Sequence, residues 1–266
     1  MFSEVVIVRG GGDIASGAIQ KLYRSGFRVL VLEVNKPSAI RRKVCFSEAI
    51  YDEETNIEGI RAVRVNCEAE IFKAWRDNVI PVVVDPKGKY IELLKPEIVV
   101  DAILAKKNLG TNMNMAPYTI ALGPGFEAGV DVNIVVETNR GHNLGRLIFE
   151  GKAAKDTGIP GVIAGYSKER VIYSPASGII NNARDIGDIV NKGDILSYIG
   201  TETVKATIDG VLRGTIRNNT EVFKGLKIAD IDPRLSETKN CFTISDKARN
   251  IGGAVLESIL YLIRNK

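Results

Sequence analysis

The chain has 266 residues, enough for one large domain or two of ordinary size. Its composition, with 45% hydrophobic and 26% charged residues, is typical of a globular protein. Its net charge of +4 comes from scattered basic residues, which argues against nucleic-acid binding. No apolar stretch approaches the roughly 18 residues of a membrane span, and a strand predicted within the first residues leaves no room for a signal peptide. We therefore expect a cytoplasmic protein that does not bind membranes. The three cysteines are far apart and lack CxxC spacing, so we expect neither a disulfide framework nor a metal site.

The first predicted elements are a strand at residues 5–8, a glycine turn and a helix. Gly10, Gly11 and Gly12 allow the backbone to turn sharply and to approach a bulky anionic group. The helix that follows presents unpaired N–H groups and a positive dipole end to that anion. Gly10-x-Gly12-x-x-Ala15 satisfies the dinucleotide-binding fingerprint in its Ala-ending form.

A second predicted strand, at residues 29–32, ends on Glu33, about 20 residues after the turn, where such folds place a carboxylate that binds the ribose. Asp13 suits the helix dipole but would repel a pyrophosphate. Either Asp13 faces away from the ligand, or the ligand arrives with a metal or with the neighbouring Arg9. The predicted nucleotide site is made of Arg9, Gly10, Gly11, Gly12, Asp13 and Glu33. The alternative is a tight βα turn that binds no ligand.

Further apolar runs predict a Rossmann-like parallel sheet with helices on its faces, spanning residues 1–165. The runs lie at 60–65, 80–84, 98–100, 118–122 and 132–136, with a helix predicted at 68–76. Several runs end in an acid or a glycine, and the carboxyl ends of strands border the binding crevice of such sheets. The residues expected on that rim are Asp85, Asp101, Gly123, Gly125 and Glu137. The amides of the Gly123–Gly125 turn are predicted to bind an anion.

No nucleophile–base pair is visible, so the candidate catalytic residues are three isolated groups: Glu137, His142 and Cys45. His142 is the only histidine and lies in a polar, glycine-rich loop, where it is either an acid, base or ligand or a solvated loop residue. Cys45 follows Arg41-Arg42-Lys43, whose charges would lower the pKa of its thiol. If the segment is extended, Cys45 shares a face with Lys43 and Arg41. The simpler interpretation of Cys45 is a small buried residue.

From Val171 the chain has short predicted strands that repeat after 32 positions. Gly178 begins one unit and Gly210 the next, and each ends in a Lys-Gly pair followed by spaced apolar residues. Two copies are too few for a solenoid, so we expect two quasi-symmetric halves of one β domain at 166–236. This pattern resembles the biotinyl/lipoyl-type barrel-sandwich domain. Carrier members of that family present a lysine at the tip of the hairpin between the halves. In this chain, Lys205 lies late in the segment that joins the two halves and not at the tip of its turn. We therefore expect no covalent biotin or lipoate.

The last segment, 237–266, contains a predicted amphipathic helix at 245–264 with Ser245 as its N-cap. We expect it to pack on the body of the protein. The predicted fold class is thus α/β, with a Rossmann-like domain, a small all-β barrel-sandwich domain and a C-terminal helix.

Four ordered motifs together resemble the YqeB family, whose members are named as accessory proteins of selenium-dependent molybdenum hydroxylases. The motifs are Val8–Gly17, Arg41–Ala49, Ala121–Phe126 and Val136–Gly145. The resemblance implies a role in maturing or loading the cofactor of such an enzyme, with the client enzyme or its cofactor as partner and a nucleotide or molybdopterin nucleotide as ligand. The first domain is also loosely similar to the XdhC-type maturation factors, which hand sulfur to a molybdenum cofactor; by that analogy, Cys45 would be the thiol to test.

Two alternatives stay open at this point. Glu33 suits an NAD-dependent oxidoreductase, although the repeated β module is not a substrate-binding catalytic domain. The chain also suits a non-enzymatic assembly scaffold in which the glycine turn is only structural. The sequence is compatible with a homo-oligomer.

Overall fold

A computed structural model describes residues 4–265 of the chain and divides it into two compact units. The first unit comprises Met1–Pro37, Cys45–Asp156 and Ile244–Lys266, and the second comprises Ser38–Val44 and Thr157–Thr243. The chain therefore passes between the units four times. These ranges differ from the predicted ones, because the C-terminal helix belongs to the first unit and a short early segment belongs to the second.

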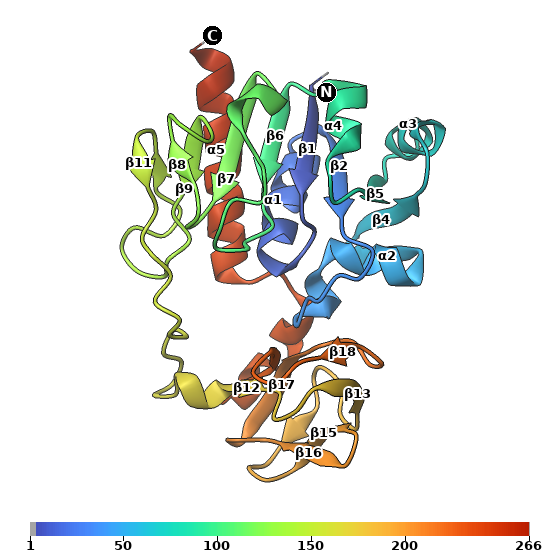
Figure 1. The fold of residues 1–266 in the computed structure, drawn as a ribbon, viewed down its shortest axis with the longest axis vertical. Coiled ribbons are helices and arrows are strands. Elements are labelled where there is room, and N and C mark those ends of the chain that lie inside the picture. Colours follow the sequence, from blue (N-terminus) through green and yellow to red (C-terminus); the bar gives the residue numbers. More distant parts are fainter. Residues whose placement is uncertain (1–3, 266) are drawn as a thin grey trace. The chain divides into compact units, whose positions relative to one another are not determined.

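The first unit is built on a nine-stranded sheet with the order β10-β9-β7-β6-β1-β2-β5-β4-β3 (Figure 1). All neighbouring strands are parallel except the edge strands β3 and β10. The strands are β1 (Val5–Arg9), β2 (Arg28–Glu33), β3 (Glu54–Ile57), β4 (Ile60–Val65), β5 (Ile80–Val84), β6 (Ile98–Asp101), β7 (Tyr118–Leu122), β9 (Ile134–Val136) and β10 (Leu147–Ile148). From β1 the chain builds outward through β2, then returns to the other side of β1 with β6. In doubly wound sheets, such a reversal marks the crevice at the carboxyl ends of the two strands.

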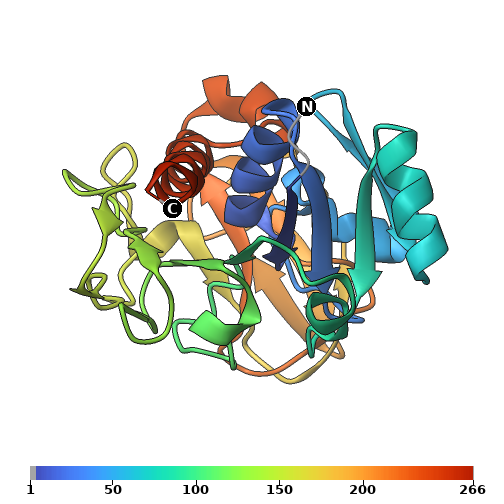
Figure 2. The ribbon, with the colours of Figure 1, turned by 90° about the horizontal axis from the view of Figure 1, so that it is seen from above.

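Helices cover both faces of this sheet, as the apolar runs predicted. Successive side chains of β1 point to opposite faces. Val6 and Val8 share one buried cluster with residues of α1 (Asp13–Arg24) and α5 (Asp246–Arg264). Ile7 shares another with residues of α3 (Glu68–Arg76) and α4 (Lys89–Leu94). Figures 1 and 2 show α5 lying alongside α1 on the same face. No described helix is long and apolar enough to cross a membrane.

The remaining elements of the first unit are short. They are α2 (Ala49–Asp52), the 3-10 turns η2 (Phe46–Glu48) and η3 (Met113–Met115), and a small sheet of β8 (Glu127–Ala128) and β11 (Gly151–Lys152). In the second unit, η1 (Arg42–Val44), η4 (Lys168–Arg170) and η5 (Leu235–Phe242) are also 3-10 turns. Cys45 lies between two 3-10 turns, η1 and η2, so the continuous extended segment considered for residues 41–45 is not formed.

The second unit consists of two small sheets whose strands recur at the spacing of the predicted repeat. Its two four-stranded antiparallel sheets have the orders β12-β19-β17-β14 and β16-β15-β13-β18. Replacing every strand by its counterpart in the other repeat turns the strand order of one sheet into the strand order of the other. The counterparts, 32 residues apart, are β12 and β16, β13 and β17, β14 and β18, and β15 and β19. The first repeat contains β12 (Val171–Tyr173), β13 (Gly178–Asn182), β14 (Ile189–Val190) and β15 (Ile195–Ile199), and the second contains β16 (Glu202–Lys205), β17 (Gly210–Thr215), β18 (Glu221–Val222) and β19 (Lys227–Asp232). Each sheet therefore takes two strands from each half, which ties the halves into one core.

Candidate functional site

Two of the three glycines in the turn after β1 are required by packing. Gly10 has a φ of +93°, and a Cβ there would lie 2.9 Å from the carbonyl oxygen of Ala102. A Cβ on Gly11 would lie 2.9 Å from the backbone nitrogen of Ser47, whose N–H donates to the Gly11 carbonyl. The protein itself occupies the space that these glycines leave.

Gly12 is different, because its side-chain position is open. Within the described chain, nothing lies within 4 Å of a Cβ built on Gly12, and its φ of −71° and ψ of −173° suit any residue. Gly12 is the N-cap of α1 and, as a glycine, makes no side-chain cap hydrogen bond. The N–H groups from Asp13 onward therefore begin a twelve-residue helix at an open turn, which is the arrangement that binds anions.

Glu33 braces the turn from the end of β2. Its Oε1 accepts the Gly11 N–H at 2.7 Å, and its Oε2 accepts the Val34 N–H at 2.7 Å. Burial raises the pKa of Glu33, although both backbone hydrogen bonds oppose that rise. Each carboxylate oxygen has a second lone pair, so Glu33 retains the capacity to accept a ribose hydroxyl.

The structure adds a lysine that the sequence analysis missed. Lys247 is half-buried in the first turn of α5, and the charges of Asp13 and Glu137 reach it. Burial lowers the pKa of the Lys247 ammonium and Arg140 lowers it further, while these two acids and Asp246 oppose the shift. A cation at a helix N-terminus is unfavourable to the helix dipole, and this was the signal available in the sequence. Lys247 provides positive charge near Asp13, whose carboxylate would otherwise repel an anion bound at the glycine turn.

Arg9 does not point to a ligand. It is 4% exposed and lies against Asp101, with its Nη1 3.7 Å from Asp101 Oδ2 and donating to the hydroxyl of Thr111. The Thr111 hydroxyl in turn donates to Asp101 Oδ2 at 2.5 Å. The prediction that Arg9 contacts an anion is thus not supported by its geometry, because the guanidinium is used to join the ends of β1 and β6.

We expect Thr111→Val to lower the stability of the first unit by about 2 kcal/mol, because it removes the hydrogen bonds that the Thr111 hydroxyl makes with buried atoms of Arg9 and Asp101. Burial raises the pKa of Asp101, and the Thr111 hydroxyl opposes that rise. Because the pKa of Asp101 is raised in the folded protein, the free energy of unfolding decreases as pH rises above 3.8. This decrease should be larger in the variant, which lacks the hydroxyl that stabilises the ionised carboxylate. Denaturant unfolding should show a larger deficit at pH 7 than at pH 4, while Thr111→Ser stays near wild type. An equal deficit at both pH values would contradict this role of the hydroxyl.

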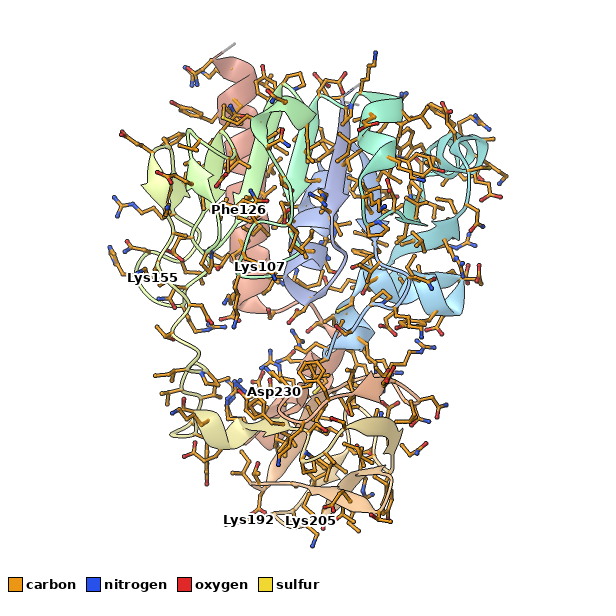
Figure 3. All side chains as sticks on the ribbon, in the orientation of Figure 1. Lys107, Phe126, Lys155, Lys192, Lys205 and Asp230 are labelled. Atoms are coloured by element: carbon orange, nitrogen blue, oxygen red, sulfur yellow. The ribbon has the colours of Figure 1, made fainter. Side chains whose placement is uncertain are left out.

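The second glycine turn is also filled by the protein. A Cβ on Gly123 would lie 2.4 Å from Oγ1 of Thr138, and one on Gly125 would lie 2.7 Å from Cα of Lys107. Figure 3 shows Lys107 near Phe126, the residue after this turn. The Gly123–Gly125 turn packs against neighbouring loops. This packing explains why glycine is required at both positions, whether or not the turn binds an anion.

The three candidate catalytic groups do not come together as an acid–base constellation. Glu137 is 5% exposed, and its two oxygens accept the N–H groups of Asn139 at 2.6 Å and Ala154 at 2.7 Å, so it braces loops. His142 is exposed, and its ring makes no hydrogen bond within the described chain. Cys45 is fully buried, whereas Arg41 and Arg42 are hydrogen-bonded to residues of the second unit. Among the described residues, no group of three or more His, Cys, Asp or Glu side chains could hold a metal.

The chain is 49% identical over 260 residues to the protein of Escherichia coli (strain K12) named "Uncharacterized protein YqeB". The match covers 98% of this chain and 48% of that protein, so the chain spans about half the length of this relative. The likeness to the YqeB family extends over nearly the whole chain. No protein-family model matches it.

Solved structures are only distantly similar. The ectoine utilization protein EutE (DoeB) of Ruegeria pomeroyi is 8% identical, with a TM-score of 0.27 and coverage of 85% of each chain. A succinylglutamate desuccinylase/aspartoacylase of Rhodobacter sphaeroides is 14% identical, with a TM-score of 0.27 and coverage of 87% of this chain and 86% of that one.

Proposed function

We propose that this chain binds a nucleotide or a pterin nucleotide at the turn formed by Gly10–Gly12, as part of an accessory protein that matures or loads the cofactor of a selenium-dependent molybdenum hydroxylase. The observation that carries the binding site is the open side-chain position at Gly12, the N-cap of α1. The partner in this proposal is the client hydroxylase or its cofactor, and the protein works in the cytoplasm.

The residues at the turn fit a phosphorylated ligand. The first amides of α1 would donate to its phosphate oxygens, and the turn lies beside the crevice where the sheet reverses between β1 and β6. Lys247 would offset the repulsion between Asp13 and the phosphate. Glu33 would accept hydrogen bonds from a ribose while it continues to hold Gly11. The bound nucleotide would supply the pterin or nicotinamide chemistry, and the residues described here only bind and orient it.

The role in hydroxylase maturation rests on the resemblance of four motifs to the YqeB family. For the second unit we propose the barrel-sandwich architecture of biotinyl and lipoyl domains, supported by the exchange of its two sheets under the internal repeat. It would serve as a non-carrier module. The hairpin between the halves turns at Gly200–Thr201, and Lys205 lies at the end of β16, beside Lys192 in Figure 3.

A second candidate is an assembly scaffold with a purely structural turn. The observation in its favour is that four glycines of the two turns, all except Gly12, have their side-chain positions occupied by protein atoms. An NAD-dependent oxidoreductase is favoured by the position of Glu33 alone. Neighbouring genes for a molybdenum hydroxylase or for selenophosphate synthesis would support the maturation role over both.

We expect Gly12→Val to weaken nucleotide binding at least tenfold, since the valine side chain enters open space at the helix N-terminus. The protein should still fold, with a loss of about 1 kcal/mol because valine is a poorer N-cap than glycine. Calorimetric titration of the purified protein with ADP, CDP, NAD⁺ and molybdopterin measures the first effect. Thermal unfolding measures the second.

The matched control is Gly253→Ala, a glycine with equally open space on α5. It should bind like wild type. If Gly12→Val binds every probe as tightly as this control, the turn is structural and the scaffold is favoured. If wild type binds none of the probes, the nucleotide part of the proposal fails. Hydride transfer with NAD⁺ and any tested substrate would instead favour the oxidoreductase.

A further inference from the structure

A pocket lies at the amino ends of β2 and β5, the opposite end of the strands from the glycine turn. Its volume is about 570 Å³, and it is lined by the last turns of α1 and α3 and the turns that follow them. Cavities of roughly 300–1,000 Å³ are the usual size of small-molecule sites. The glycine turn follows the carboxyl end of β1, so this pocket is a separate place on the same unit.

One wall of the pocket is aromatic and held in place. The Trp75 Nε1–H donates to the Val29 carbonyl at 2.8 Å, and the Tyr23 hydroxyl donates to the Asn78 carbonyl at 2.7 Å. Phe72 meets Trp75 edge to face, with ring centroids 5.5 Å apart, and remains 39% exposed. Rings held in this way offer an apolar surface to a flat molecule, and these side chains lose little conformational entropy when it binds.

The rim of the pocket carries only positive charge. Arg24, Arg28 and Arg76 line it and are exposed, whereas none of the described lining residues is acidic. Neither Arg28 nor Arg76 forms a salt bridge within the described chain, and the nearby Asp77 is bound to Lys73 at 2.5 Å. The charge of Arg76 also reaches Asp77, whose pKa it helps to lower, but no carboxylate forms a close ion pair with either guanidinium within the described chain. Guanidinium groups without a close ion pair are suited to an incoming phosphate or carboxylate.

The simplest structural role for these arginines would be to neutralise the C-terminal ends of α1 and α3. Both ends are already satisfied by backbone hydrogen bonds. The N–H groups of Gly26 and Phe27 return to the carbonyls of Tyr23 and Leu22, and those of Asn78 and Val79 return to the last turn of α3. Three arginines therefore exceed what the helix ends require. Arg28 is not part of either helix.

We propose that this pocket binds a small aromatic anion, a planar ring that carries a phosphate or a carboxylate. The ring would pack against Phe72 and Trp75, and the anionic group would accept hydrogen bonds from Arg28 and Arg76. The site is independent of the nucleotide proposed at the glycine turn.

Trp75 is the only tryptophan in the chain, so its fluorescence reports on this pocket directly. We expect phenyl phosphate, AMP or benzoate to change the Trp75 emission with saturation. Uncharged adenosine and phenol, and inorganic phosphate without a ring, should bind at least tenfold more weakly. A response to phenyl phosphate and AMP but not to benzoate would show that the site accepts a phosphate. A response to benzoate as well would show that it also accepts a carboxylate.

Arg28→Gln and Arg76→Gln should each weaken binding about tenfold, the loss expected for one charged hydrogen bond. The matched control is Arg61→Gln, an exposed arginine on the neighbouring strand β4 that pairs with Glu54 outside the pocket. Gly12→Val should leave the Trp75 response intact, which separates this site from the glycine turn. Equal binding of charged and uncharged rings, no response to any aromatic anion, or arginine variants that match Arg61→Gln would each overturn the proposal.

Discussion

Gly252→Ala is expected to destabilise the first unit by about 3 kcal/mol. A Cβ on Gly252 would lie 2.4 Å from the carbonyl oxygen of Gly17 in α1. Both atoms belong to helix backbones, so neither can move aside as a side chain would, and one helix must shift. A loss of this size lowers the melting temperature by on the order of 8 °C, and faster amide exchange in α1 and α5 should accompany it.

The control for this prediction is the next residue along the same helix. Gly253 has nothing within 4 Å of its Cβ position among the described residues, so Gly253→Ala should stabilise α5 by up to about 1 kcal/mol through helix propensity. Gly17→Ala should behave like Gly252→Ala, because its Cβ would lie 2.1 Å from the carbonyl oxygen of Ala248. Equal effects at the two adjacent glycines of α5 would contradict the close helix crossing.

This crossing also matters for the proposed site. It brings the first turn of α5 against α1, and Asp13 lies one helical turn before Gly17 on the same face of α1. Lys247 is adjacent in sequence to Ala248, the residue that Gly17 contacts. The small side chains at the crossing thus explain how Lys247 comes near Asp13. A variant that separates the helices should weaken anion binding together with stability.

Local patterns in the sequence predicted much of the fold, for identifiable reasons. Continuous apolar runs marked the buried parallel strands because both faces of the sheet are covered. The predicted N-cap of the C-terminal helix is confirmed: the Ser245 hydroxyl accepts the Ala248 N–H at 3.2 Å. The 32-residue repeat predicted paired halves of one β unit, since strands at equal offsets occupy equivalent places in the two sheets.

Long-range packing could not be predicted in the same way. The glycines of both turns look alike in sequence, yet only the structure shows that Gly12 is open while Gly11 lies against Ser47. Arg9 beside a glycine turn suggested anion binding, whereas its partner Thr111 lies 102 residues further along the chain. The place of Ser38–Val44 in the second unit likewise depends on contacts with distant residues, such as Arg42 with the carbonyl of Thr215 at 3.0 Å.

Asp232→Ala should destabilise the second unit by about 3 kcal/mol, because it removes the buried carboxylate that two arginines share. Asp232 is fully buried at the end of β19, and its Oδ2 accepts hydrogen bonds from Arg213 and Arg234 at 2.8 Å each. Glu237 also lies near Arg234, with 3.7 Å between its Oε2 and Nη2 of the arginine, but its side chain is more exposed than that of Asp232. Amide exchange in β17 and β19 should accelerate, while the exposed control Glu221→Ala leaves it unchanged.

The pH dependence gives an independent test of the same cluster. Burial alone would raise the pKa of Asp232, but the hydrogen bonds and charges of Arg234 and Arg213 outweigh burial and hold that pKa below its ordinary value of 3.8. The unfolded chain therefore takes up the proton first as the solution is acidified. The contribution of Asp232 is fully present above pH 3.8 and is lost as pH falls through the lower folded pKa. The difference in stability between wild type and Asp232→Ala should shrink below pH 4, and a difference that stays constant down to pH 2 would show that the ion pairs do not stabilise the unit.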